Sequence, residues 1–106
     1  MAIKSAQIAT STTPTNIVTT GGFNGNGDVN TPISVTLYNP GTVAIYVGPS
    51  STGTPLSASN GFLVPPQVAS TSPGPPTVFT FYGGDFSSLY AYSASATTLH
   101  VLATSQ

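Results

Sequence analysis

Alternation of apolar and polar residues with a period of two is the dominant pattern of this 106-residue chain. Ile33, Val35 and Leu37 alternate with hydroxyl and aromatic side chains, and residues 43–47 resume the alternation. This period is typical of strands with one buried face. The intervening residues 39–42, Asn-Pro-Gly-Thr, form a turn sequence. We therefore predict that the two runs pair as a β-hairpin.

Strand patterns recur over most of the remaining chain. They occupy residues 7–10, 16–19, 61–64, 77–82, 89–94 and 97–103. The last two are predicted to form a second hairpin with its tip near Ser95. No segment keeps apolar residues at helical spacing for three turns, because proline and glycine interrupt them. The pattern predicts an all-β fold: one small antiparallel β-sandwich or jelly roll of about eight short strands.

The length fits a single domain. We expect residues 1–16 to form an N-terminal arm or an edge strand, and residues 17–106 to form the β-sandwich domain. Within that domain, residues 65–76 are rich in proline and predict an extended loop. Residues 21–28 are rich in glycine and asparagine and predict a second, polar loop.

Charge is nearly absent and changes the functional picture. Lys4, Asp28 and Asp85 are the only formally charged side chains, a fraction of 3%, whereas soluble proteins have ~25%. Because most enzymes position acids, bases or metal ligands, we predict no enzyme and no catalytic residues. One lysine is too few to neutralise several phosphates, so we predict no binding to nucleic acid or to an anionic membrane. A net charge of −1 favours self-association instead.

Two candidate metal sites have too few ligands. Residues 24–28, Asn-Gly-Asn-Gly-Asp, resemble a calcium loop, but Asp28 is its one acid. A turn is the better interpretation. His100 is the sole histidine and lies within a predicted strand, and only a three-fold axis could assemble a histidine cage from it. We predict a structural histidine, no metal and no cofactor.

Three tyrosines are the candidate binding residues. Tyr46 alternates with the aliphatic residues of its strand, and Tyr90 and Tyr92 share the face opposite Leu89 and Ala91. If the aliphatic side chains point inward, the three rings point outward, and outward aromatic side chains often mark contact surfaces. The alternatives are that a loop or the N-terminal segment covers this face, or that the inward and outward assignments are reversed.

Four motifs and their order carry a family resemblance. They are residues 36–41 (TLYNPG), 45–48 (IYVG), 60–65 (NGFLVP) and 89–95 (LYAYSAS), followed by a threonine-rich final strand. In this order they resemble the small β-sandwich virion proteins of tailed bacteriophages, of the head decoration or cement type, over roughly residues 31–103. The long proline-rich loop and the low charge depart from the usual pattern of that family.

The resemblance implies a structural role with defined partners. Such a protein would bind the outside of an assembled capsid and stabilise it, with the major capsid protein and its own copies, as a homotrimer, for partners. It would be made in the host cytoplasm, in keeping with an N-terminus that lacks the apolar core of a signal peptide. The alternatives are a receptor- or carbohydrate-binding module of a phage tail fibre, disfavoured because tryptophan is absent and acids are scarce, and a head-completion or tail-assembly protein.

Overall fold

Eight strands and one helical turn make up the described chain. A computed structural model describes residues 2–23, 32–66, 77–82 and 88–105. The strands are β1 (Ala2–Thr10), β2 (Thr15–Asn16), β3 (Pro32–Tyr38), β4 (Ile45–Gly48), β5 (Phe62–Val64), β6 (Thr77–Tyr82), β7 (Tyr90–Ser93) and β8 (Thr97–Ser105). The helix is α1 (Ile17–Thr20). The prediction of an all-β sandwich is therefore confirmed.

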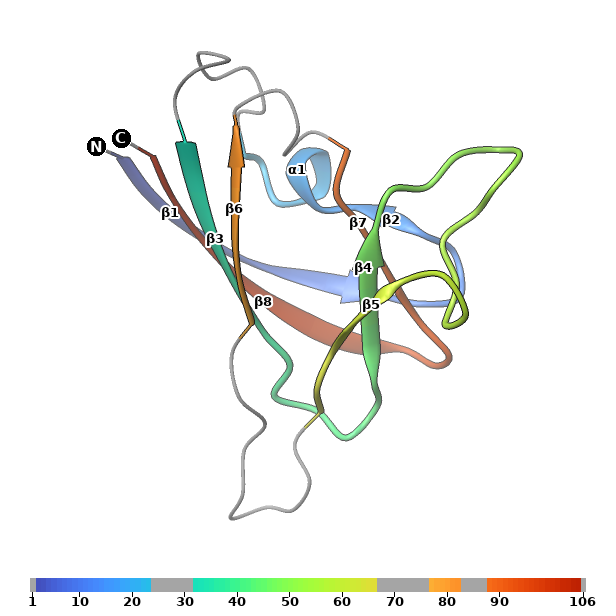
Figure 1. The fold of residues 1–106 in the computed structure, drawn as a ribbon. Coiled ribbons are helices and arrows are strands. Elements are labelled where there is room, and N and C mark those ends of the chain that lie inside the picture. The colour runs from blue at the N-terminus through green and yellow to red at the C-terminus, as the bar shows by residue number, and fades with distance from the viewer. Residues whose placement is uncertain (1, 24–31, 67–76, 83–87, 106) are drawn as a thin grey trace.

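The strands form two four-stranded antiparallel sheets that pack face to face (Figure 1). The first sheet has the order β1-β8-β3-β6, and the second sheet has the order β2-β7-β4-β5. Strand β1 pairs with β8, β2 with β7, β3 with β6 and β4 with β5. The chain thus resembles one long hairpin, in which the first half (β1 to β4) pairs with the second half (β5 to β8). The pairs β1–β8 and β3–β6 lie in the first sheet, and the pairs β2–β7 and β4–β5 lie in the second. The order is that of a jelly roll.

The two predicted hairpins are wrong in their pairing, although their strands exist. Strand β3 lies in the first sheet and β4 in the second, and β7 and β8 are likewise in different sheets. In each case the turn carries the chain across the core from one sheet to the other. Period-two alternation is the same for both arrangements, because it marks the face that is buried and not the sheet that contains the strand.

Buried polar side chains hold these crossings together. Thr10, Asn39 and Ser93 are the three buried polar residues of the described chain, and each lies where the chain leaves one sheet for the other. The Asn39 amide nitrogen donates to the carbonyl of Val43 at 2.7 Å, and its oxygen accepts from the Gly41 amide at 3.1 Å. The hydroxyls of Thr10 and Ser93 lie 2.8 Å apart, in hydrogen-bond contact. Each polar group thus has a partner that offsets its burial.

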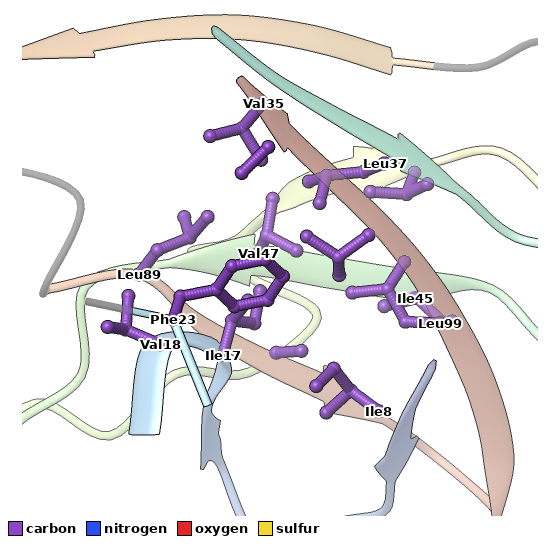
Figure 2. Close-up of a cluster of buried hydrophobic side chains, with 14 residues drawn as sticks. Ile8, Ile17, Val18, Phe23, Val35, Leu37, Ile45, Val47, Leu89 and Leu99 are labelled. Atoms are coloured by element: carbon purple, nitrogen blue, oxygen red, sulfur yellow. The ribbon is translucent and has the colours of Figure 1, made fainter. Parts of the chain in front are cut away.

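The core lies between the sheets (Figure 2). The first sheet contributes Ile8, Val35, Leu37, Leu99, Val101 and Ala103, and the second contributes Ile45, Val47, Val64 and Ala91. Ile17 and Val18 of α1, together with Phe23 and Leu89, complete the cluster. In β3, β4 and β7 the buried residues Val35, Leu37, Ile45, Val47 and Ala91 are those that the predicted alternation places inward, so the residues between them face outward.

The segment around residues 16–19 differs from its predicted strand. Residues Thr15–Asn16 pair with β7, and a single helical turn follows at Ile17–Thr20. The side-chain oxygen of Asn16 accepts a hydrogen bond from the amide of Thr19 at 2.9 Å, as an N-cap does. Local capping therefore outweighs the strand preference of the β-branched residues Ile17 and Val18.

Residues 2–10 form β1, the edge strand of the first sheet. Every residue of β1 pairs with a residue of β8, from Ala2 with Ser105 to Thr10 with Thr97. Lys4 donates a 2.7 Å hydrogen bond to the carbonyl of Gly22. The calcium-like sequence 24–28 with Asp28, residues 67–76 of the proline-rich loop, and Asp85 lie outside the described residues.

Candidate functional site

The outer face of the second sheet presents the three tyrosines. Tyr46, Tyr90 and Tyr92 are each half-buried, while their strand neighbours Ile45 and Ala91 are fully buried in the core. The structure therefore places all three side chains outward. We call this surface the tyrosine face and define it by Tyr46, Tyr90 and Tyr92.

Strand register brings Tyr46 and Tyr92 directly opposite each other on β4 and β7. Tyr90, two residues along β7, lies opposite Gly48 on one side and Asn16 on the other. Directly opposed side chains in an antiparallel pair have Cβ atoms about 4.5–5.5 Å apart. The tyrosines from two separate sequence motifs are thus neighbours on one face of the sheet.

The apolar surface continues onto the edge strand β5. Leu63 lies opposite Tyr46 and is 43% exposed, so it extends the tyrosine face. Phe62 is 58% exposed but pairs with the core-facing Val47, so it lies on the other side of β5. The sequence pattern predicts a strand at residues 61–64 but does not mark Leu63 as a contact residue. A signal was present, because three consecutive apolar residues, Phe62, Leu63 and Val64, cannot all face the core of a strand with period two.

The loop between β4 and β5 covers one margin of the tyrosine face. Leu56 is 2% exposed but is not part of the core cluster. A Cβ placed on Gly61 would lie 2.7 Å from the Cβ of Tyr46 and 3.0 Å from Cδ1 of Leu56, so these three residues are in close contact. One alternative from the sequence, that a loop covers this face, therefore holds at the Tyr46 margin.

Side chains of the loop itself hold it in shape. The hydroxyl of Ser50 accepts from the Leu56 amide at 3.0 Å, which positions Leu56. The side-chain oxygen of Asn60 accepts from the Ser57 amide at 2.8 Å, and its nitrogen donates to the carbonyl of Pro55 at 3.0 Å. In Figure 1 the loop extends beyond the end of β4, away from the first sheet. The tyrosine face thus lies beside an internally bonded loop.

His100 lies on the other outer face, that of the first sheet. It is half-buried on β8, and its ring meets the ring of Tyr38 edge-on with a centroid distance of 6.1 Å. Among the described residues, no group of three or more His, Cys, Asp or Glu could hold a metal ion. In the same part of the chain, no helix is long and apolar enough to cross a membrane.

Comparison with protein-family models, with curated proteins and with solved structures finds no match for this chain. The two outer faces and the chemistry of their side chains are therefore the features that indicate a function.

Proposed function

We propose that the protein is a structural component of a phage virion that binds the outside of the capsid and stabilises it as a decoration protein. One observation carries the proposal: the Tyr46–Tyr92 pair, flanked by the 43% exposed Leu63, forms an outward apolar and aromatic surface. Aromatic residues are enriched at protein interfaces, and charged residues are depleted from interface cores. The family resemblance of the motifs adds the kind of partner.

The partners are the major capsid protein and further copies of this chain, as a homotrimer. A chain with only three charged side chains has little electrostatic repulsion to oppose its self-association. Each copy makes modest contacts with its neighbours and with the capsid. Copies that are already held together bind the lattice with a high effective concentration, so weak contacts sum to a stable coat.

Rebinding to stripped capsids tests this function. Capsids freed of the protein are mixed with the purified chain, and the bound fraction is measured after sedimentation. The parent chain should bind, while Tyr46→Ala and Tyr92→Ala should each bind about thirtyfold more weakly, because truncation of an interface tyrosine costs about 2 kcal/mol. Light scattering of the free parent should give the mass of a trimer.

The matched control is Val78→Ala, which removes an exposed apolar side chain from the first sheet, away from the tyrosine face. It should rebind like the parent. Far-UV circular dichroism of every variant should keep the β-sheet spectrum. Tyrosine variants that rebind like the parent would refute the tyrosine face as the contact surface, and a parent that never binds capsids would refute the function.

A further inference from the structure

A hollow of about 520 Å³ opens on the outer face of the first sheet, where β1, β8 and β3 lie side by side. Its outward-facing lining comes from all three strands: Ser5, Gln7, Thr36, Tyr38, His100 and Leu102. We call it the Tyr38 hollow. Its volume is in the range of small-molecule sites in proteins, about 300–1,000 Å³.

Strand register arranges the lining in two adjacent rows. In the first row, His100 lies opposite Gln7 on one side and Tyr38 on the other. In the second row, Leu102 lies between Ser5 and Thr36 in the same way. The hollow therefore combines an aromatic ring and an aliphatic side chain with an amide, an imidazole and two hydroxyls.

The polar groups of the hollow are not used by the protein. Within the described part of the chain, the side chains of Ser5, Gln7 and Thr36 make no hydrogen bond to other residues. The imidazole of His100 packs edge-on against the ring of Tyr38. Elsewhere in the sandwich, buried polar side chains such as Asn39 and Ser93 are fully paired. Ser5 and Gln7 are exposed, so their donors and acceptors face solvent and are available to a ligand that displaces water.

The hollow also lacks fixed charge in the part of the chain that the structure describes. Lys4, between Ile3 and Ser5 on β1, has the opposite strand parity to the hollow residues and donates to the carbonyl of Gly22 at 2.7 Å. An anionic or cationic ligand would lose hydration here without gaining an opposite charge. A neutral ligand with many hydroxyls loses less and gains hydrogen bonds.

We propose that the Tyr38 hollow is a binding site for a neutral carbohydrate, one or more uncharged sugar rings of a glycan. The sequence disfavours a carbohydrate-binding module because tryptophan is absent and acids are scarce, but in the hollow Tyr38 supplies an aromatic ring and Gln7 an amide in their place. A sugar ring has an apolar C–H face, which the surfaces of Tyr38 and Leu102 match. Its hydroxyls both donate and accept, as do the side chains of Gln7, Ser5 and Thr36. This proposal does not rest on the capsid function, because the hollow and the tyrosine face lie on opposite outer faces of the sandwich.

Titration of the full ¹⁵N-labelled chain with neutral oligosaccharides tests the proposal. The probes are maltotriose, cellotriose, chitotriose and lactose, each followed by the backbone amide shifts in two-dimensional NMR spectra. At least one should give saturable shifts at Gln7, Thr36 and His100, with a Kd of about 1 mM or tighter. Glucose 6-phosphate, a charged probe, should give none.

Two variants and a control make the test specific. Tyr38→Ala and Gln7→Ala should each weaken the binding about tenfold. Gln7 is exposed, so its substitution leaves the fold intact even if Tyr38→Ala does not fold. Thr80→Ala removes an exposed hydroxyl of the same sheet outside the hollow and should leave the Kd unchanged.

Three results would overturn the site. The first is the absence of saturable shifts with every neutral probe at about 10 mM, ten times the expected Kd. The second is undiminished binding by Gln7→Ala. The third is shifts of the hollow residues that follow protein concentration and not sugar, which would make this face a contact between copies of the chain.

Discussion

The two outer faces of this sandwich obey the same alternation rule but offer different chemistry. The face of the second sheet presents Tyr46, Tyr90 and Tyr92 together with Leu63, which lies opposite Tyr46. On the first sheet, the exposed apolar side chains Ile3, Val78 and Leu102 lie among hydroxyls, and the surface is hollowed. Among the described residues the one charged side chain, Lys4, bonds to Gly22 and belongs to neither surface, so shape and hydrogen-bonding groups distinguish the two faces.

This difference indicates how a nearly uncharged chain can obtain specificity. A continuous apolar face gains free energy from the area it removes from water, which suits a protein partner. A hollow with unpaired donors and acceptors gains little from area and depends on matched hydrogen bonds, which suits a small polar ligand. The following predictions separate these two faces.

The largest loss of stability is expected at the turn between β3 and β4, because this turn connects the two sheets that carry the two faces. Asn39→Ala removes a fully buried side chain that bonds to Val43 and Gly41 between β3, which carries Tyr38, and β4, which carries Tyr46. It leaves the part-buried backbone groups of Val43 and Gly41 and the buried carbonyl of Val64 without this partner, so the free energy of unfolding should fall by about 2–3 kcal/mol. Urea denaturation measures the change.

The control for that crossing is Thr42→Ala, at an exposed position of the same turn, which should change stability by less than about 0.5 kcal/mol. An Asn39→Ala protein as stable as the parent would show that the crossing does not depend on its side-chain hydrogen bonds.

A smaller effect, confined to one face, is expected from Gly61→Ala. The added methyl group would lie 2.7 Å from the Cβ of Tyr46 and 3.0 Å from the carbonyl oxygen of Ser57, so the loop must shift. Stability should fall by about 1–2 kcal/mol. Amide shifts should change near Tyr46 and Leu56 but not near His100. Changes of equal size on both faces would contradict their independence.

The substitution Leu63→Ala tests whether the contact surface extends from the tyrosine face onto β5. Because Leu63 is 43% exposed in the free chain, its truncation should leave the melting temperature within a few degrees of the parent value. If β5 belongs to the contact surface, capsid rebinding should weaken about fivefold, a loss of about 1 kcal/mol. Unchanged rebinding would restrict the surface to β4 and β7.

The smallest effect is expected from salt. With three charged side chains in the chain, screening has little to act on from the protein side. Capsid rebinding and self-association should change less than about threefold between 0.1 and 1 M sodium chloride. A collapse of binding over this range would mean that the partner recognises the few charges of the chain.

The sequence predicts the inward and outward positions because alternation depends only on neighbouring residues. Tyr46 and Tyr92 face outward as predicted, and the prediction of a strand at residues 77–82 matches Thr77–Tyr82. Pairing between strands is different, since it depends on contacts between distant segments. Alternation cannot distinguish a hairpin from a crossing between sheets, and both predicted hairpins were wrong for that reason.

The Tyr38 hollow could not be predicted in the same way. Gln7 and Tyr38 belong to β1 and β3, and they share a row only because β8 lies between those strands. The sequence predicts a structural role for His100 because it is the sole histidine and lies within a strand. Its place in the lining of the Tyr38 hollow, between Gln7 and Tyr38, follows only from the sheet order.

Chemical modification of the tyrosines is the most direct test of the central claim, that the tyrosine face is the contact surface. The free and the capsid-bound protein are nitrated with tetranitromethane, digested with pepsin because the chain has a single basic cleavage site at Lys4, and analysed by tandem mass spectrometry. Half-buried Tyr38, on the opposite outer face, is the internal reference. The account predicts that capsid binding protects Tyr46 and Tyr92 while Tyr38 reacts at its free rate. Equal reaction of Tyr46 and Tyr92 in both states, or protection of Tyr38 alone, would contradict it.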